Sequence, residues 1–190
     1  MNEPKGIPPR ASPDDYQAKA KAGAVTIAAD FDEHSAPTPD GTYSTEEYVI
    51  VEAAVFGAPE AHLQLSRGDF NLRINDRKAP LVSQPFELVA RSLKDPSWVP
   101  PDEGKEKSKG GLTSGGQDAG SPPPPPPKMP VPLQLAMEQK VQKATLLQGD
   151  RVLPQAGLLF FEYRGKVKNI RSVELIYDGP AGKATLELQP

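Results

Sequence analysis

The chain contains two histidines, and one of them has acidic neighbours that could form a metal site with it. His34 follows Asp30, Asp32 and Glu33, and clustered carboxylates are the ligands that hard cations require. The glycine and the spacing of a calcium-binding loop are missing, and His34 and His62 form neither an i,i+4 pair nor an H-x-E motif. We therefore expect a solvated polar strand end here, with no metal and no cofactor.

The residues that nucleophilic catalysis needs are also missing. There is no cysteine, which excludes thiolate nucleophiles, disulfides and thiolate metal sites. In the segment 111–115 the serine comes one position too late for a G-x-S-x-G elbow, and no strand and helix flank it. We expect the protein not to be an enzyme. The alternative is a hydrolase or small-ligand-binding protein whose site is assembled from scattered Asp, Glu and His side chains.

A basic turn in the last third of the chain could contact phosphate or an acidic partner. It consists of Tyr163, Arg164, Lys166, Lys168 and Arg171. Acidic residues flank the turn, and no group of aromatic residues accompanies it as a stacking platform. A solvated hairpin is therefore the favoured interpretation.

Residues 95–130 form a polar segment with ten prolines, six glycines and one aromatic residue. Such a segment cannot bury enough apolar surface to offset the entropy of ordering it, so we expect a disordered loop within a folded domain. Its six-proline run favours polyproline II, and Pro123, Pro126 and Lys128 fit the proline-rich pattern that aromatic grooves bind. A stiff spacer has the same composition and is favoured over a ligand.

Trp98 is expected to cover the folded domain, or to anchor a partner if it is exposed. Trp98, Pro123, Pro126 and Lys128 are thus the candidate partner-binding residues.

Charge and hydropathy narrow the class of partner. Lys and Arg number 22 against 25 Asp and Glu, and the net charge of −3 cannot hold a polyanion, so we expect no nucleic acid. No apolar run is long enough to span a bilayer. The N-terminus lacks the apolar stretch of a signal peptide, so a periplasmic or secreted location requires an upstream leader, and otherwise a cytoplasmic one is expected.

The elements that must position these residues are short strands. Alternation places Val25, Ile27, Ala29 and Phe31 on one face of a strand over residues 24–31. The segment 48–56 is apolar on both faces, which predicts a central strand covered on both sides. Further strands are expected at residues 63–65, 70–74, 79–81, 158–163, 173–177 and 184–188, and an extended segment that leads into the insertion at residues 86–90. An amphipathic helix is expected at residues 133–144, with Leu133, Met137, Val141 and Ala144 on its apolar face.

This pattern predicts a mainly β, immunoglobulin-like antiparallel β-sandwich in a single domain. Residues 1–20 would be a disordered tail, 21–94 the first part of the sandwich, 95–130 the insertion, and 131–190 the helix and last strands. A monomer is compatible with the sequence.

Two stretches, Gly68–Asn75 and Leu153–Tyr163, support this fold by resemblance. They are similar to bacterial extracellular immunoglobulin-like domains of unknown function, in which a "D-F-x-L" strand precedes a late "L-P-x-x-G-x-L-x-F" strand. The resemblance covers about residues 46–188 and implies a β-sandwich attached to an envelope protein. Its motifs are short and apolar, so they concern the fold more than an activity.

The sequence therefore predicts a non-catalytic interaction module of the bacterial cell envelope that binds another protein through loops or an edge strand. A structural spacer without a specific ligand is the third alternative.

Overall fold

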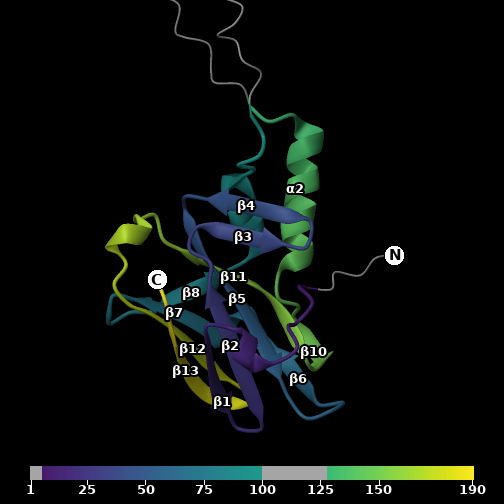
Figure 1. Ribbon diagram of the computed structural model, residues 1–190, viewed down its shortest axis with the longest axis vertical. Coiled ribbons are helices and arrows are strands. Elements are labelled where there is room, and N and C mark those ends of the chain that lie inside the picture. The colour runs from purple at the N-terminus through teal and green to yellow at the C-terminus, as the bar shows by residue number, and fades with distance from the viewer. Residues whose placement is uncertain (1–5, 100–127) are drawn as a thin grey trace, which may run out of the picture.

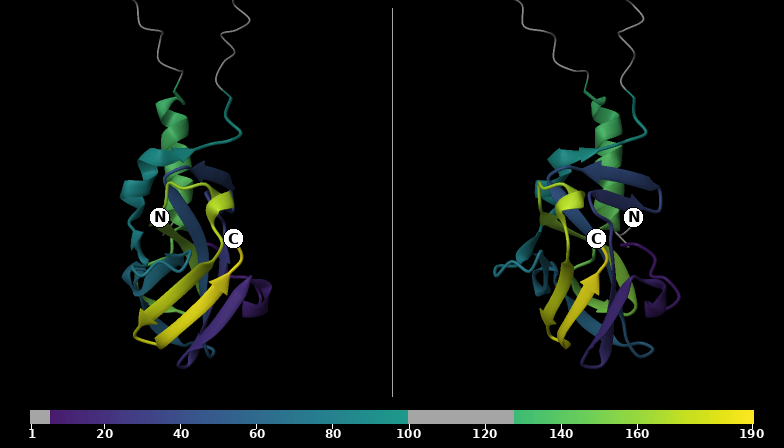
Figure 2. Two further views of the ribbon diagram at one scale, coloured as in Figure 1. Left: turned by 90° about the vertical axis from the view of Figure 1, so that its left-hand side faces the viewer. Right: turned by 60° about the vertical axis from the view of Figure 1, so that its left-hand side comes forward.

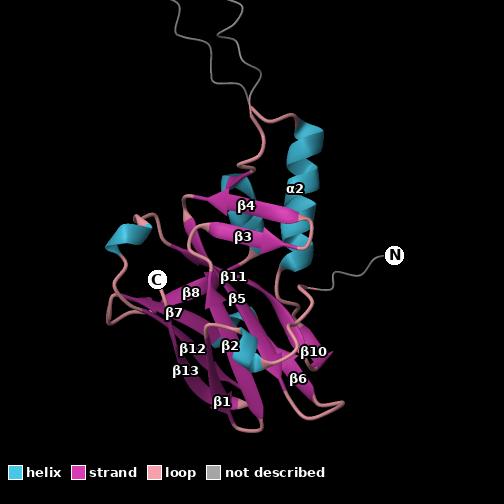
Figure 3. Ribbon diagram, in the orientation of Figure 1, coloured by secondary structure: helices cyan, strands magenta, loops and turns pink. Residues whose placement is uncertain are grey.

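The computed structural model describes residues 6–99 and 128–190, and most of its strands form one antiparallel sheet (Figures 1 and 3). In sheet order these strands are β1 (Ala18–Ala22), β2 (Val25–Phe31), β5 (Tyr48–Phe56), β11 (Gln155–Glu162), β8 (Leu81–Gln84), β7 (Phe70–Ile74), β12 (Val173–Gly179) and β13 (Gly182–Leu188). The two outermost strands, β1 and β13, lie side by side (Figure 2). The sheet therefore curls into a nearly closed barrel.

The remaining elements lie outside this barrel. A three-stranded sheet contains β3 (Ser35–Thr38), β4 (Gly41–Thr45) and β9 (Leu93–Lys94), and a two-stranded ribbon contains β6 (His62–Leu65) and β10 (Gly149–Val152). Within the described residues, the helices are α1 (Phe86–Val89) and α2 (Val131–Ala144), with short 3₁₀ turns η1 (Pro13–Asp15), η2 (Arg67–Asp69), η3 (Ala90–Ser92) and η5 (Val167–Asn169). The prediction of an extended segment at residues 86–90 was therefore wrong, because these residues form α1 and the start of η3. Figure 1 shows α2 standing beside β3 and β4.

The barrel interior is filled by alternate side chains of its strands. The predicted inward face of β2 is confirmed, because Val25, Ile27, Ala29 and Phe31 all belong to the main buried cluster. The same holds for β7, whose apolar residues alternate with half-buried Asn71 and Arg73. Period-two alternation therefore identified the strand faces correctly.

A second core lies on the outer face of β5 and β11. Ile50 and Phe160 point away from the barrel interior and pack with residues of β3, α1 and α2. Eight of the nine residues of β5 are buried, which confirms the prediction of a strand covered on both faces.

Helix α2 begins two residues earlier than predicted and buries a smaller part of its apolar face. Met137, Val141 and Ala144 are buried against the second core. Leu133, expected on that face, is 50% exposed. Only the C-terminal turns of the helix lie over the sheet, so spacing alone overestimated the length of the covered stretch.

The N-terminal segment 6–20 packs on the barrel, although its composition predicted a disordered tail. Residue Ile7 forms a bridge with Ala156 of β11, and its amide donates to the Ala156 carbonyl at 2.9 Å. Tyr16 is buried against Phe56, with ring centroids 6.0 Å apart. The composition of this segment could not reveal its order, because the contacts that hold it come from strands far away in the sequence.

The structure confirms a mainly β, antiparallel fold. None of the helices in the described ranges is long and apolar enough to cross a membrane.

Gly157 on β11 allows the backbone after α2 to cross the sheet closely. A Cβ atom at this position would lie 2.8 Å from the carbonyl carbon of Thr145 and nearer still to the backbone of Leu146. The close crossing is fixed by the Leu146 amide, which donates to the Leu158 carbonyl at 3.1 Å. Backbone atoms cannot shift as a flexible side chain does, so glycine is required here.

We predict that Gly157→Ala lowers the free energy of unfolding by about 2 kcal/mol, because overpacking would push residues 145–146 off the sheet. The measurement is urea unfolding followed by circular dichroism. Gly68→Ala is the matched control, since the nearest atom to its Cβ would be Ser66 Oγ at 3.5 Å, an ordinary contact. Equal stability of the two variants would contradict this account.

Candidate functional site

Asp30, one of the acidic residues before His34, lies on the outer face of the barrel, where it is buried next to a second carboxylate. Asp30 of β2 stands opposite Glu52 of β5, and each is less than a tenth exposed. A single guanidinium nitrogen of Arg10, Nη2, makes two ion pairs. One is with Asp30, and the other is with Glu52 Oε2 at 2.8 Å. The same guanidinium lies 4.4 Å above the ring of Tyr16. A single cation from the N-terminal segment thus compensates two buried carboxylates.

Asp32 is a third carboxyl near this group, and its pKa is raised to about 7, mainly by burial. Repulsion from Glu52 and Asp30 contributes to this raised pKa, while Arg10 acts to lower it. Its Oδ2 atom is buried without a hydrogen-bond partner in the described structure. Burial is likewise the main cause that raises the pKa of Glu52. An uncharged Asp32 avoids placing a third negative charge beside Arg10.

These residues do not form the solvated strand end that the sequence suggested. Within the residues that the structure describes, no group of three or more His, Asp or Glu side chains is arranged to hold a metal ion. Asp30 and Glu52 are instead used to fasten the segment containing Arg10.

His34 connects the start of β5 with the basic turn. Its Nδ1 atom lies 2.7 Å from the carbonyl oxygen of Tyr48, and its Nε2 atom lies 2.9 Å from that of Gly165. Its ring also stacks on Tyr163, with centroids 6.3 Å apart. The residue predicted as a possible metal ligand therefore holds the basic turn against the barrel.

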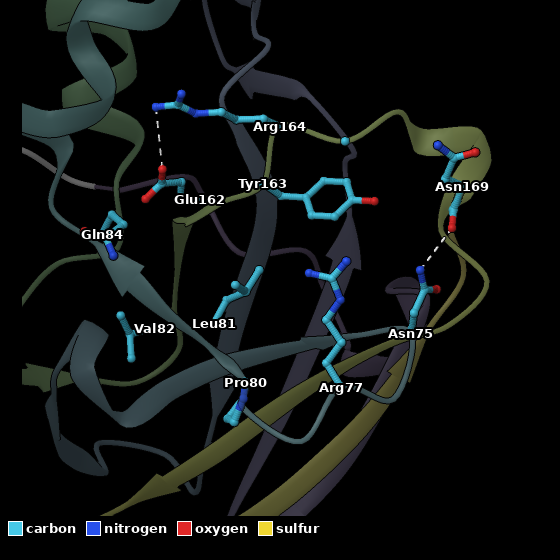
Figure 4. Close-up of a pocket in the computed structure, with 11 residues that line it drawn as sticks. Asn75, Arg77, Pro80, Leu81, Val82, Gln84, Glu162, Tyr163, Arg164 and Asn169 are labelled. Atoms are coloured by element: carbon cyan, nitrogen blue, oxygen red, sulfur yellow. Dashed lines mark hydrogen bonds and ion pairs between the residues drawn. The ribbon is translucent and has the colours of Figure 1, made fainter.

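An open hollow of about 710 Å³ lies between this turn and the chain that joins β7 to β8 (Figure 4). We call it the basic groove, and its lining residues are Asn75, Arg77, Pro80, Leu81, Val82, Gln84, Glu162, Tyr163, Arg164, Gly165 and Asn169. Figure 4 shows the Arg77 side chain extending toward Tyr163. An adjoining hollow shares Asn75 and Asn169 and adds Lys168 and Arg171. The linings of the two adjoining hollows together include four cations from two separate segments.

Asn75 holds the two walls of the basic groove together. Its side-chain nitrogen donates to the Asn169 carbonyl at 3.0 Å, and its side-chain oxygen accepts from the Arg171 amide at 2.6 Å and the Ser172 amide at 3.3 Å. Asn75 and Asp76 have φ values of 55° and 56°, which gives the turn after β7 the primed geometry that suits a hairpin. The groove is thus largely formed before any partner arrives.

The basic turn was predicted from the sequence, whereas Arg77 and Asn75 were not predicted as its partners. Asparagine tolerates positive φ, so the place of Asn75 in a turn was recognisable from the sequence. The contact of Asn75 with residues 169–172 could not be recognised in the same way, because it depends on the pairing of β7 with β12, which brings these segments together.

Of the predicted partner-binding residues, the structure describes Trp98 and Lys128. Trp98 is half-buried, and its amide donates to the Asp95 carbonyl at 3.1 Å. Lys128 is exposed just before α2. Pro123 and Pro126 lie outside the described residues, as does Ser114 of the near-miss elbow. His62 is exposed beside Asp150, with 3.6 Å between Nδ1 and Oδ1.

Comparisons of the chain with protein-family models, with curated proteins and with solved structures found no match. The resemblance to extracellular immunoglobulin-like domains therefore stays a prediction.

We predict that Arg10→Ala lowers the free energy of unfolding by about 2 kcal/mol, because it leaves Asp30 and Glu52 buried without a counter-charge. The control is Lys183→Ala, which removes an exposed partner of Asp178 at 3.8 Å and should cost less than about 0.5 kcal/mol. Chemical denaturation at neutral pH compares the two variants. A smaller effect for Arg10→Ala than for Lys183→Ala would contradict the bridging role.

We also predict a pH dependence that Asp32→Asn removes. The folded protein keeps the Asp32 proton up to a pKa of about 7, whereas the unfolded chain releases it near 3.8. Asp32 therefore stabilises the fold fully below the unfolded pKa, and this contribution is lost as the pH rises through about 7. The difference in unfolding free energy between wild type and Asp32→Asn should fall between pH 4 and pH 8. A constant difference over that range would show that Asp32 titrates normally.

Proposed function

We propose that the protein is a non-catalytic interaction module that binds an acidic segment of another protein in the basic groove. The observation that carries this proposal is that Arg77 and Arg164 line the basic groove while Lys168 and Arg171 line the adjoining hollow, and that Asn75 fastens the walls of both. Guanidinium groups suit carboxylates because they can donate two parallel hydrogen bonds.

Few carboxylates lie near these cations. The lining residues of the two hollows include the carboxylates Glu162 and Asp76, and Glu162 already lies 3.6 Å from Arg164. In the described part of the chain, no carboxylate makes an ion pair with Arg77, Lys168 or Arg171. A partner that brings two or more negative charges would therefore improve the local charge balance.

The groove also offers apolar contact area. Val82 is 60% exposed, and Pro80, Leu81 and Tyr163 line the same hollow. An acidic segment that also carries apolar side chains would fit better than a polyanion of phosphates, which needs no apolar surface. This mixture of surfaces favours a protein partner over nucleic acid.

Loops support the proposal better than an edge strand does. The ends of the barrel sheet, β1 and β13, lie against one another. At one edge of the smaller sheet, β3 carries Pro37, and proline blocks the hydrogen bonding that an added strand needs. Of the two routes expected from the sequence, we therefore propose the loop surface.

The immunoglobulin-like classification and a location in the bacterial envelope remain proposals of the same kind. The antiparallel strands support the first. The second depends on the motif resemblance alone.

The test uses fluorescence anisotropy with a labelled decapeptide of alternating Glu and Val at low salt. We predict saturable binding that Arg77→Gln weakens about tenfold, since one charge-assisted pair contributes about 1.4 kcal/mol or more. Added salt should weaken it further. Lys94→Gln is the control, because Lys94 is exposed near Glu46 and does not line the groove.

Absence of binding at low salt, or equal losses in the two variants, would overturn the proposal. A protein lacking residues 100–127 should bind the peptide as the full chain does. Loss of binding on that deletion would instead favour the site predicted at Trp98, Pro123, Pro126 and Lys128.

A further inference from the structure

A second hollow of about 680 Å³ lies where the C-terminal end of α2 meets the start of α1. We call it the helix-end pocket, and it shares no lining residue with the basic groove. Its apolar lining consists of Pro85, Phe86, Leu146 and Leu147. Leu146 belongs to the buried core and Phe86 packs on Phe160, with ring centroids 6.5 Å apart. The apolar part of the pocket is therefore held by the packed interior.

Three cations line the same pocket, namely Arg67, Lys143 and Arg151. The carboxylate among the lining residues is the exposed Glu87. In the described structure, none of the three cations makes an ion pair with a carboxylate. The pocket thus combines an apolar wall with an excess of positive charge.

Gln148 fixes the two arginines at the pocket edge. Its side-chain oxygen accepts from the Arg67 amide at 2.9 Å, and its backbone carbonyl accepts from Arg151 Nε at 3.0 Å. Arg67 Nη1 also lies 3.4 Å from the Ser83 carbonyl. These bonds leave further guanidinium N–H groups of both arginines for a ligand, since each guanidinium has five. Held cations bind an anion with a smaller loss of side-chain entropy.

We infer that the helix-end pocket binds a small organic acid with one carboxylate and an apolar body. The carboxylate would contact Arg67 and Arg151, and the apolar body would lie against Phe86 and Leu147. The volume is within the range of pockets that bind small molecules, roughly 300–1,000 Å³. This site is independent of the proposed acidic segment, because the two surfaces have no residue in common.

The test is isothermal titration calorimetry of the full chain with octanoate at neutral pH. We expect saturable binding of one equivalent, and at least tenfold weaker binding of 1-octanol and of acetate. The first analogue lacks the carboxylate and the second lacks the apolar body. Equal affinity for octanoate and either analogue would overturn the inference, as would the absence of saturable octanoate binding.

Variants locate the site. Arg151→Gln should weaken octanoate binding about tenfold, whereas Arg151→Lys, which keeps the charge, should weaken it less. Arg91→Gln is the control, because Arg91 is exposed and lines neither the groove nor this pocket. Unchanged octanoate affinity in Arg151→Gln, with an unchanged circular dichroism spectrum, would overturn the assignment.

A third variant separates this inference from the proposed function. Arg77→Gln should leave octanoate binding unchanged while it weakens the binding of the acidic peptide. Failure of the peptide assay alone would leave the octanoate result standing, and loss of octanoate binding in Arg77→Gln would overturn the placement in the helix-end pocket.

Discussion

The constraint on which the structure depends is that β5 and β11 are apolar on both faces. A barrel covers only the inner face of its strands, so the outer face of these two must be covered by other parts of the chain. Helix α2 and the strands β3 and β4 cover one part of this face, and the N-terminal segment covers another. The elements outside the barrel are therefore needed to bury the outer face of β5 and β11.

The same constraint explains the unusual position of Arg10. The outer face of β2 and β5 contains Asp30 and Glu52 among buried apolar residues. Covering this face with an apolar segment would leave two charges without compensation. A segment with an arginine satisfies both requirements, because it compensates the charges and covers the surface around Tyr16.

Local sequence patterns predicted the parts of the fold that depend on local geometry. The faces of β2, β5 and β7 followed from alternation, and α2 followed from helical spacing. Local patterns did not predict that the N-terminal segment is ordered, because its contacts are with strands distant in the sequence. The candidate site was predictable only in part. The basic turn was visible in the sequence, whereas Arg77, Asn75 and the role of His34 depend on which strands become neighbours.

The seam between β1 and β13 also has a consequence for how the chain folds. These strands are the first and last of the described sequence, and their contact brings the two ends of the sheet together. Contacts between residues so far apart must overcome a large loop-closure entropy, which slows folding. On the ribosome, β1 and β2 would emerge long before β13, so the barrel would stay open until residues 182–188 had been synthesised. Until then β12 would have one unpaired edge and β1 would lack its neighbour β13, which makes this period the most exposed to aggregation.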